Sequence, residues 1–339
     1  MRLNKIILTA ICVTVMSMPS SAEEKIKYYE SGNIMLKAEV VNDEVNGEMI
    51  MYYESGAIMA KGMHKNGKKE GEHVSYYENG NIKEIGSFET DSPVGEYIVY
   101  YEDGISIDQK GLYEDGVMSY SRFYKSGALE EDGGVLVDGK INGHITSYHE
   151  NGNLKGVTTF VDGKAEGDFY LYHENGKLSQ KGNYKNGVMT GKVIKYYEDG
   201  VSIAQEVSVE NGKQNGPYSM FYQGGDYKLK GFYKDGKING EIKLFYESGN
   251  LEEIREYENG LMEGQVELYY EGGALSGQMM YKNNKQNGSY STYHENGNVS
   301  QKGNYENGLL DGEVFIYDEM GKQTGVRLFN KGQEIIKGE

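Results

Sequence analysis

The sequence has one cysteine, three prolines and no tryptophan among its 339 residues. The cysteine, Cys12, lies within the first 22 residues, so the rest of the chain cannot form a disulfide framework. After Ala22 there is no second long apolar run, no low-complexity run and no basic block. Nothing in the sequence therefore marks a separate catalytic or membrane-spanning domain.

Catalytic and cofactor-binding signatures are missing as well. The sequence has no Gly-x-Ser-x-Gly elbow, no His-Glu-x-x-His pair and no phosphate-binding loop. Positive charge is scarce, because 35 Lys and Arg stand against 52 Asp and Glu, a formal net charge of −17. A chain of that sign repels nucleic-acid phosphates and anionic lipid surfaces, so we expect neither as a partner. We also expect no enzyme activity and no cofactor.

The first 22 residues differ from the rest of the chain. Arg2 and Lys5 precede an apolar stretch from Ile6 to Met16, and small residues lead up to Ala22. This order is typical of a secretory signal peptide, and the apolar stretch is short for a membrane anchor. The sequence therefore predicts a signal peptide at 1–22, cleavage near Ala22, and export to the periplasm, the outer surface or the medium.

Glycine and tyrosine, in contrast, are abundant and recur at a fixed spacing. There are 48 Gly, and 31 Tyr against nine Phe. The stretch "YHENGKLSQKGNYKNG" at 172–187 recurs as "YHENGNVSQKGNYENG" at 293–308. A glycine near the end of each such phrase repeats about every 24 residues, so residues 23–339 form an array of about 13 copies. These glycines are Gly32, Gly56, Gly80, Gly104, Gly127, Gly152, Gly176, Gly200, Gly225, Gly249, Gly273, Gly297 and Gly321.

One period, "GEIKLFYESGNLEEIREYENGLMEG" at 240–264, predicts a β-hairpin. A run from Ile242 to Tyr246 is followed by a Ser-Gly break, and a second run from Leu251 to Tyr257 ends at Asn-Gly. Such tight turns need positive φ, which glycine adopts without a Cβ clash, whereas recurrent glycine would break a helix. We therefore expect an all-β fold of tandem hairpins stacked into one elongated, twisted antiparallel sheet, with Gly264 beginning the next copy.

The phrases "GEYIVYYEDG" (95–104), "GKVIKYYEDG" (191–200) and "GEVFIYDEMG" (312–321) alternate with "NGKKEG" (66–71), "DGKAEG" (162–167) and "DGKING" (235–240). In this pattern the chain resembles MORN repeats, and more closely their bacterial variant, over about residues 28–332. The resemblance implies hairpins stacked in chain order and a role in binding or scaffolding rather than catalysis. Some bacterial relatives carry an antitoxin label, but the signal peptide argues against a cytoplasmic antitoxin.

The pattern is irregular in three places. Near 116–127 the phrase "DGVMSYSRFYKSG" lacks the glycine expected before the strand, so we expect a shortened or reshaped turn there. At 90–95 the Asn-Gly turn is replaced by Ser92-Pro93, and at 283–288 it is replaced by Asn283-Asn284. Drift of this kind is expected in exposed turns.

The first strand of each copy predicts an aromatic ladder, because side chains alternate between the two faces of a strand. Counted from the strand glycine, the fifth residue is aromatic in every copy with a clear phase, including Tyr52, and Phe123 is its counterpart in the irregular copy. The opposite face would carry the second, fourth and sixth positions, such as Val266, Leu268 and Tyr270.

This ladder is the candidate binding site, because tyrosine offers a flat apolar face with a hydroxyl at its rim. Such faces suit peptides, protein hot spots and sugar rings. Recurrence in every copy also favours packing between hairpins, so we expect binding in one contiguous subset of rungs. The candidate binding residues are Tyr76, Tyr100, Tyr148, Tyr172, Tyr196, Phe221, Phe245, Tyr269, Tyr293 and Tyr317.

Histidines and glutamates also recur, but they indicate no catalytic or metal site. His149, His173 and His294 each replace the second tyrosine of the Tyr-Tyr-Glu phrase, and adjacent copies should lie about 9.5 Å apart, an awkward span for sharing a zinc ion. Glutamates repeated beside a turn fit a solvated position better than a catalytic pair. The acidic stretch at 130–139 lacks the ligand order of a calcium loop.

The sequence is best interpreted as an exported, non-enzymatic repeat protein that presents an extended surface to a protein partner, either as a scaffold or as a surface-interaction module. A carbohydrate- or cell-wall-binding module that uses the tyrosine ladder is the alternative. An enzyme has only the abundant carboxylates in its favour.

Overall fold

The computed structural model describes residues 22–336, so the predicted signal peptide lies outside the described residues except for Ala22. The chain divides into two compact units, unit 1 (Met1–Met118) and unit 2 (Ser119–Glu339). All regular structure in residues 22–336 is β-strand, in one antiparallel sheet of 30 strands that does not close on itself. The predicted all-β class with tandem hairpins is confirmed.

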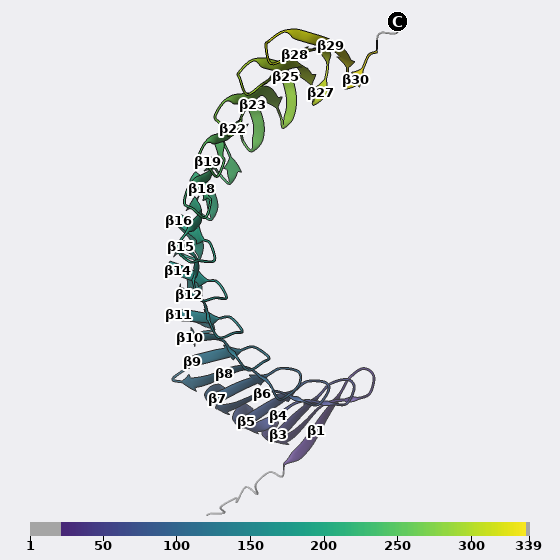
Figure 1. Ribbon diagram of the computed structural model, residues 1–339. Helices are drawn as coiled ribbons and strands as arrows, with labels where there is room; N and C mark the ends of the chain where they lie inside the picture. Colours follow the sequence, from purple (N-terminus) through teal and green to yellow (C-terminus); the bar gives the residue numbers. More distant parts are fainter. Residues whose placement is uncertain (1–21, 337–339) are drawn as a thin grey trace, which may run out of the picture. The chain divides into compact units, whose positions relative to one another are not determined.

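Within each unit the strands follow one another as hairpins in chain order (Figure 1). In unit 1 the strands are β1 (Glu23–Tyr28), β2 (Ile34–Val41), β3 (Glu44–Tyr52), β4 (Ile58–Lys65), β5 (Lys68–Tyr76), β6 (Ile82–Glu89), β7 (Ser92–Tyr100) and β8 (Ile107–Glu114). The boundary between the units falls in β9 (Val117–Phe123).

In unit 2 the strands are β10 (Leu129–Val137), β11 (Lys140–Tyr148), β12 (Leu154–Val161), β13 (Lys164–Ala165), β14 (Gly167–Tyr172), β15 (Leu178–Lys185), β16 (Val188–Tyr196), β17 (Ile203–Glu210), β18 (Lys213–Phe221), β19 (Tyr227–Lys234), β20 (Lys237–Ile238), β21 (Gly240–Phe245), β22 (Leu251–Glu258), β23 (Leu261–Tyr269), β24 (Leu275–Lys282), β25 (Lys285–Tyr293), β26 (Val299–Glu306), β27 (Leu309–Leu310), β28 (Gly312–Tyr317), β29 (Gln323–Asn330) and β30 (Gln333–Glu334).

Most strand glycines lie at bulges inside strands, whereas Gly167, Gly240 and Gly312 begin β14, β21 and β28. The expectation that Gly264 begins a copy is therefore corrected. Gly264 lies in the middle of β23 with φ of 92°, a backbone conformation that glycine adopts without strain. The pairing with β22 slips around it, because Arg255 pairs with Val266 but Tyr257 pairs with Met262. Such a bulge bends the strand and increases its local twist. The sequence signal was therefore correct in requiring glycine but wrong about where the strand starts.

The narrow turn that joins one copy to the next has the two-residue geometry that Asn-Gly favours. At Asn66 and Gly67 both residues have positive φ, 51° and 76°, as a type I′ hairpin turn requires. Asn283 and Asn284 keep this geometry without glycine, at 52° and 66°, so the predicted Asn-Asn turn is confirmed. Asparagine tolerates this conformation better than most residues with a side chain.

At 90–95 the predicted Ser92-Pro93 turn is wrong. The turn residues are Thr90 and Asp91, which have φ of 52° and 68°. Ser92 and Pro93 already belong to β7, where they pair with Glu89 and Phe88 of β6. Proline signals a turn in sequence because it fixes φ, but the same negative φ also fits the first residues of a strand.

The irregular copy is shortened in its first strand, not in its turn as expected from the sequence. Strand β9 has seven residues, whereas first strands such as β7 and β11 have nine. The preceding turn keeps its geometry, with φ of 50° at Asp115 and 78° at Gly116. A left-handed glycine instead occurs in the following strand, at Gly133 of β10 with φ of 91°.

The buried side chains gather on one face of the sheet, which we call the core face. They occupy the second position after the strand glycine and neighbouring positions on paired strands. In unit 2 they include a continuous apolar cluster whose members touch across consecutive strands. The cluster consists of Phe169, Val193, Val207 and Val209.

Glycines on the second strands make room for these side chains. Gly182 of β15 pairs with Phe169 of β14, and a Cβ on Gly182 would lie 2.7 Å from Cε1 of Phe169. The next residue along this face, Tyr184, stacks against Phe169 with ring centroids 4.9 Å apart. Aromatic rings thus lie across backbone that has no side chain of its own, which gives each copy dense packing without a second layer.

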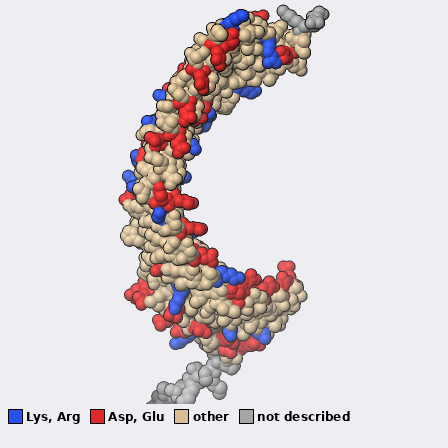
Figure 2. All heavy atoms as spheres, viewed as in Figure 1, with Lys and Arg blue, Asp and Glu red and all other residues tan. Residues whose placement is uncertain are grey.

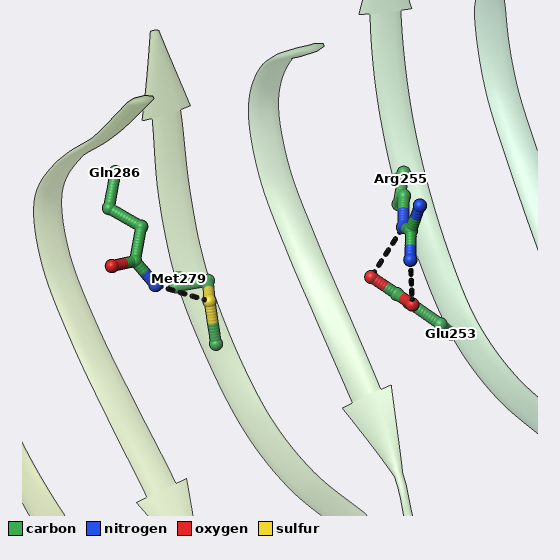
Figure 3. Close-up of polar contacts among 4 residues, drawn as sticks. All are labelled: Glu253, Arg255, Met279 and Gln286. Carbon is green, nitrogen blue, oxygen red and sulfur yellow. Dashed lines mark hydrogen bonds and ion pairs between the residues drawn. The ribbon is translucent and has the colours of Figure 1, made fainter. Parts of the chain in front are cut away.

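Two second strands of unit 2 place arginine where other copies have this glycine. Arg255 of β22 pairs with Ile242 and donates from Nε and Nη2 to the two oxygens of Glu253, both at 2.6 Å (Figure 3). This hydrogen-bonded carboxylate raises the pKa of the guanidinium. In Figure 3 the neighbouring amide Nε2 of Gln286 points at Sδ of Met279, 3.1 Å away. The core face is therefore partly polar in this region.

Candidate binding surface

Every candidate ladder residue is the last residue of a first strand, and every one is half-buried. Tyr76 and Tyr100 end β5 and β7 in unit 1. The other eight lie in unit 2, where they end β11, β14, β16, β18, β21, β23, β25 and β28. They point to the face opposite the core face, which we call the ladder face. Half-burial means that each ring both packs against neighbours and offers part of its surface to solvent.

The aromatic residue at the sixth position after the strand glycine, which the sequence pattern assigned to the opposite face, instead joins one copy to the next. Tyr270 lies just beyond β23, and its hydroxyl donates to the backbone carbonyl of Tyr293, at 2.7 Å. The same bond recurs along both units, always onto the carbonyl of the next ladder residue. Its tyrosine donors are Tyr29, Tyr53, Tyr77, Tyr124, Tyr197, Tyr222, Tyr246 and Tyr270.

The three recurring histidines take the same role. Nε2 of His149 lies 2.9 Å from the carbonyl oxygen of Tyr172, and Nε2 of His294 lies 3.1 Å from that of Tyr317. His173 lies between two carbonyls, those of Tyr196 and Tyr197. The expectation that histidine here replaces a half-polar aromatic agrees with this geometry. Among the described residues, no group of three or more His, Cys, Asp or Glu is placed to hold a metal ion.

The turns at both ends of the hairpins are linked between copies as well. The wide turns are those that join the first strand of a copy to its second strand, such as the turn between β21 and β22. There, Nδ2 of Asn250 donates to the carbonyl of Glu271 in the next copy, at 2.8 Å. At the narrow turns, the Gly260 amide donates to the carbonyl of Ile238, at 2.9 Å. The recurring glutamates thus take part through their backbone carbonyls. These links fix the spacing of the rungs on the ladder face.

Lysines lie over several rungs. The ammonium of Lys181 is 5.7 Å from the ring centroid of Tyr196, and that of Lys302 is 5.5 Å from Tyr317. Lys61 lies over Tyr76 at 5.9 Å. Each lysine stands one strand before the rung it covers, so the contact follows from the phase of the repeat. A cation over an aromatic ring is stabilised by the ring's electron density.

Other rungs are held by polar side chains. The hydroxyl of Tyr269 donates to Oε2 of Glu267, which raises the pKa of Tyr269 to about 12, with burial adding to the effect. The hydroxyl of Tyr293 donates to Oε1 of Gln278, at 3.2 Å, and Gln278 in turn donates to Oε1 of Glu267, at 3.3 Å. In this copy the polar groups of the ladder face already have partners within the chain.

The rungs Phe221 and Phe245 differ from the others, because they lack a hydroxyl and lie beside a further aromatic. Phe221 pairs with Tyr227, with ring centroids 4.9 Å apart, and Tyr227 lies 6.4 Å from Phe245. The residue that starts the second strand is aliphatic or polar beside the other nine candidate rungs. Lys230 lies 3.4 Å above the Tyr227 ring and 5.7 Å from Phe245.

Phe232 continues this group along β19. It is two residues beyond Lys230 on the same strand and therefore on the same face. Its side chain is 44% exposed, and that of Tyr227 is 40% exposed. We call these five residues, Phe221, Tyr227, Lys230, Phe232 and Phe245, the aromatic–lysine patch. Sequence reasoning included Phe221 and Phe245 but missed Tyr227 and Phe232, whose signal is aromatic residues at positions where other copies have none.

Charge is distributed unevenly around the patch. The segment 211–245 contains six lysines and three carboxylates, whereas 246–275 contains one arginine and eight glutamates. Figure 2 shows more red than blue on the face in view, in agreement with the negative net charge. The segment 211–245 is therefore a basic stretch in an acidic chain.

The concave features of the ladder face are shallow. One open depression is lined by Asp168, Tyr170, Lys181, Asn183 and Lys192. Another borders Gln265, Gln278 and other residues of β23, β24 and β25. Neither encloses a small molecule as a catalytic cleft does. No helix in residues 22–336 is long and apolar enough to cross a membrane.

The fold and the surface define a class of protein, an open all-β array of hairpin repeats. A sequence profile of the family described as "MORN repeat variant" matches seven segments, and the chain is thus a MORN-repeat protein of the variant form. The matched segments are 45–66, 69–90, 141–162, 165–186, 238–259, 262–283 and 286–307. The recognition made from the repeated phrases is confirmed.

Further comparisons add little. No curated protein matches the chain. One solved structure that matches the chain, titled "Crystal Structure of TcdB2-TccC3-TEV", is 10% identical with a TM-score of 0.18. The match covers 88% of this chain and only 18% of that chain. A likeness this weak says nothing of what this chain binds.

Proposed function

We propose that this protein is an exported, non-enzymatic scaffold that binds a protein partner along its ladder face. The observation that supports it best is the ladder itself, a row of half-buried aromatic rings at the ends of consecutive first strands, held in register by bonds between copies. Partly exposed aromatics on a rigid sheet are the side chains that dominate protein–protein binding. The export half of the proposal rests on the signal-peptide pattern of residues 1–22.

A non-enzymatic role fits the chemistry of the surface. The carboxylates of the ladder face are spread along the repeats, where Lys192 pairs with Glu206 at 2.8 Å and Lys243 pairs with Glu241 at 2.7 Å. Three of these four side chains are more than 40% exposed, and the depression beside Lys192 is open to solvent. A hydrolase would need two carboxylates in one cleft, in environments that separate their pKa values.

A protein-capture experiment separates this function from its alternative. Mature protein, residues 23–339, is used as bait on detergent extracts of envelope from the native host, with chemical cross-linking before washing. The same protein is applied to a glycan array in parallel. We expect a specific protein partner and no glycan signal. Strong, saturable binding to one class of glycan, with no protein cross-linked, would replace the scaffold with the carbohydrate-binding alternative.

A further inference from the structure

The aromatic–lysine patch is a part of the ladder face where apolar rings are exposed. Two rungs outside it have hydroxyls bonded to side chains of the chain, Tyr269 to Glu267 and Tyr293 to Gln278. Phe221 and Phe245 have no hydroxyl, so their exposed rims can only be satisfied by apolar contact. Within the described part of the chain, no Asp or Glu lies within ion-pair distance of Lys230, whose ammonium is held over Tyr227.

We propose that the aromatic–lysine patch binds a short extended segment of a partner protein that carries carboxylates beside aromatic or aliphatic side chains. This proposal rests on the scaffold function and names the chemistry of its partner. Three rings, Phe221, Tyr227 and Phe245, lie in a row with centroid spacings of 4.9 and 6.4 Å, and the larger spacing is close to the distance between alternate side chains of an extended peptide. Side chains on one side of such a peptide recur about every 6.6–6.8 Å.

Charge complementarity selects an acidic segment. Of the six lysines of 211–245, Lys243 already pairs with Glu241. The other five are Lys213, Lys228, Lys230, Lys234 and Lys237. The acidic neighbouring segment, 246–275, limits the length of the acidic stretch, because Glu256 and Glu267 lie on the same face in the next copy. Charges further apart than about 8–10 Å are screened at physiological salt, so the basic region attracts carboxylates only at close range. The segment should be acidic over the patch and neutral or basic beyond it.

The same features disfavour sugar as the occupant. Sugar rings are held by hydrogen bonds from polar side chains in addition to stacking, and two of the rungs in this patch are phenylalanine. They also disfavour a second copy of this chain, because two chains of net charge −17 repel one another before contact. Both remain as outcomes of the test below.

The test uses full-length mature protein and an array of fluorescent ten-residue peptides. The first set alternates Glu with Phe or Leu, the second replaces the apolar residues with Ala, and the third replaces Glu with Lys. We expect the first set to bind, with affinity falling as salt rises, and the other two sets to bind at least tenfold more weakly.

Two pairs of variants localise the binding. Phe232→Ala should weaken it by about tenfold, whereas Met280→Ala, at the same repeat position and 37% exposed, should leave it unchanged. Lys230→Gln should weaken it and reduce its salt dependence, whereas Lys302→Gln, the matched lysine over Phe315 and Tyr317, should do neither. Equal effects in both members of each pair, or no binding of the acidic apolar set, would overturn the proposal.

Two further outcomes would refute the peptide proposal. Self-association of the wild type in sedimentation velocity that Phe232→Ala abolishes would assign the patch to a second copy and overturn the peptide proposal. The scaffold function fails separately from the patch. A native partner whose capture is lost in other ladder variants but survives Phe232→Ala keeps the function and refutes only this site.

Discussion

Single side chains carry the links between copies. Strand alternation predicts that the two residues of the Tyr-Tyr phrase lie on opposite faces of the sheet, but the second residue instead joins neighbouring copies. The first packs on the ladder face, and the hydroxyl of the second reaches the next copy, as Tyr197 does at 2.6 Å from the carbonyl of Phe221. Sequence periodicity located both residues but assigned the second to the wrong place, because the chain leaves the strand between them and strict alternation ends there.

Removing one such hydroxyl measures its contribution. Tyr197→Phe deletes the hydrogen bond to Phe221 while leaving the ring, so we expect a loss of about 1 kcal/mol in the free energy of unfolding. Tyr172→Phe is the control, because the Tyr172 hydroxyl makes no hydrogen bond to the described residues. Urea unfolding followed by circular dichroism gives both values. A loss in the control as large as in Tyr197→Phe would show that the link between copies contributes nothing specific.

A pair of histidines, one buried and one half-buried, makes unit 1 sensitive to acid. His64, 9% exposed, and His73 contact edge to face with ring centroids 5.1 Å apart, and His73 also contacts Phe88. Burial lowers the pKa of both histidines below the ordinary value of 6.5, while Lys69 lowers them further and Asp91 opposes the shift. The unfolded chain therefore binds protons more readily than the folded chain as the pH falls below about 6.5.

Folded stability should accordingly fall as the pH drops from about 6.5 toward the lower folded pKa values of His64 and His73. The double variant His64→Phe/His73→Tyr places at these positions residue types found at the same phase in other copies, at Phe88 and Tyr97. We expect the urea midpoint of the wild type to drop more between pH 7.5 and 5.0 than that of the variant. Identical pH dependence in the two proteins would contradict this account.

At the scale of one hairpin, the sequence predicted more than it missed. Asn-Gly, Asp-Gly and Ser-Gly pairs located both turns of most copies, because glycine and asparagine adopt positive φ more readily than most residues, but the Thr90-Asp91 turn was missed. The bulge at Gly264 was missed, because a bulge glycine and a turn glycine have the same sequence signal. The packing of the core face was missed because it depends on glycines such as Gly182, which make room for a neighbouring ring and leave no apolar side chain for the sequence pattern to show.

The mid-strand glycines give a direct test of this packing. Gly182→Ala would place a Cβ 2.7 Å from Cε1 of Phe169 and 3.1 Å from Cγ2 of Val193, so the core must shift. We expect a loss of about 1–3 kcal/mol in the free energy of unfolding. Gly224→Ala is the matched control, because nothing lies within 4 Å of its added Cβ. Equal stability of the two variants would mean that the close approach at Gly182 is not tight.

At the scale of the whole molecule, the repeat pattern predicted the family and the fold class, because each copy buries surface mainly against the next. It could not predict which rungs form a patch, because Tyr227 and Phe232 are departures from the repeat rather than parts of it. The ladder residues are similar in burial but differ in the side chains that surround them. Its ten candidate residues are all half-buried, yet only Phe221 and Phe245 share an aromatic neighbour on the adjoining strand.

Export is tested on the protein from its native host. Because Ser20 and Ala22 fit the small-residue rule for signal peptidase, we expect the mature chain to begin at Glu23. Intact-mass spectrometry of the purified protein, with N-terminal sequencing, checks this. Recovery of a soluble cytoplasmic protein that retains residues 1–22 would contradict export.

The claim that a protein partner binds the ladder face is tested most directly by site-directed cross-linking. The mature chain has no cysteine of its own, so a single introduced cysteine carries a photoactivatable cross-linker at one defined place. Gln265→Cys places it on the ladder face beside the patch, and Lys195→Cys places it on the opposite face. Both residues are exposed. In native envelope extracts we predict a discrete cross-linked protein from position 265 and none from position 195. Cross-linking of the same protein from position 195 but not from 265, or of none from either, would contradict the account.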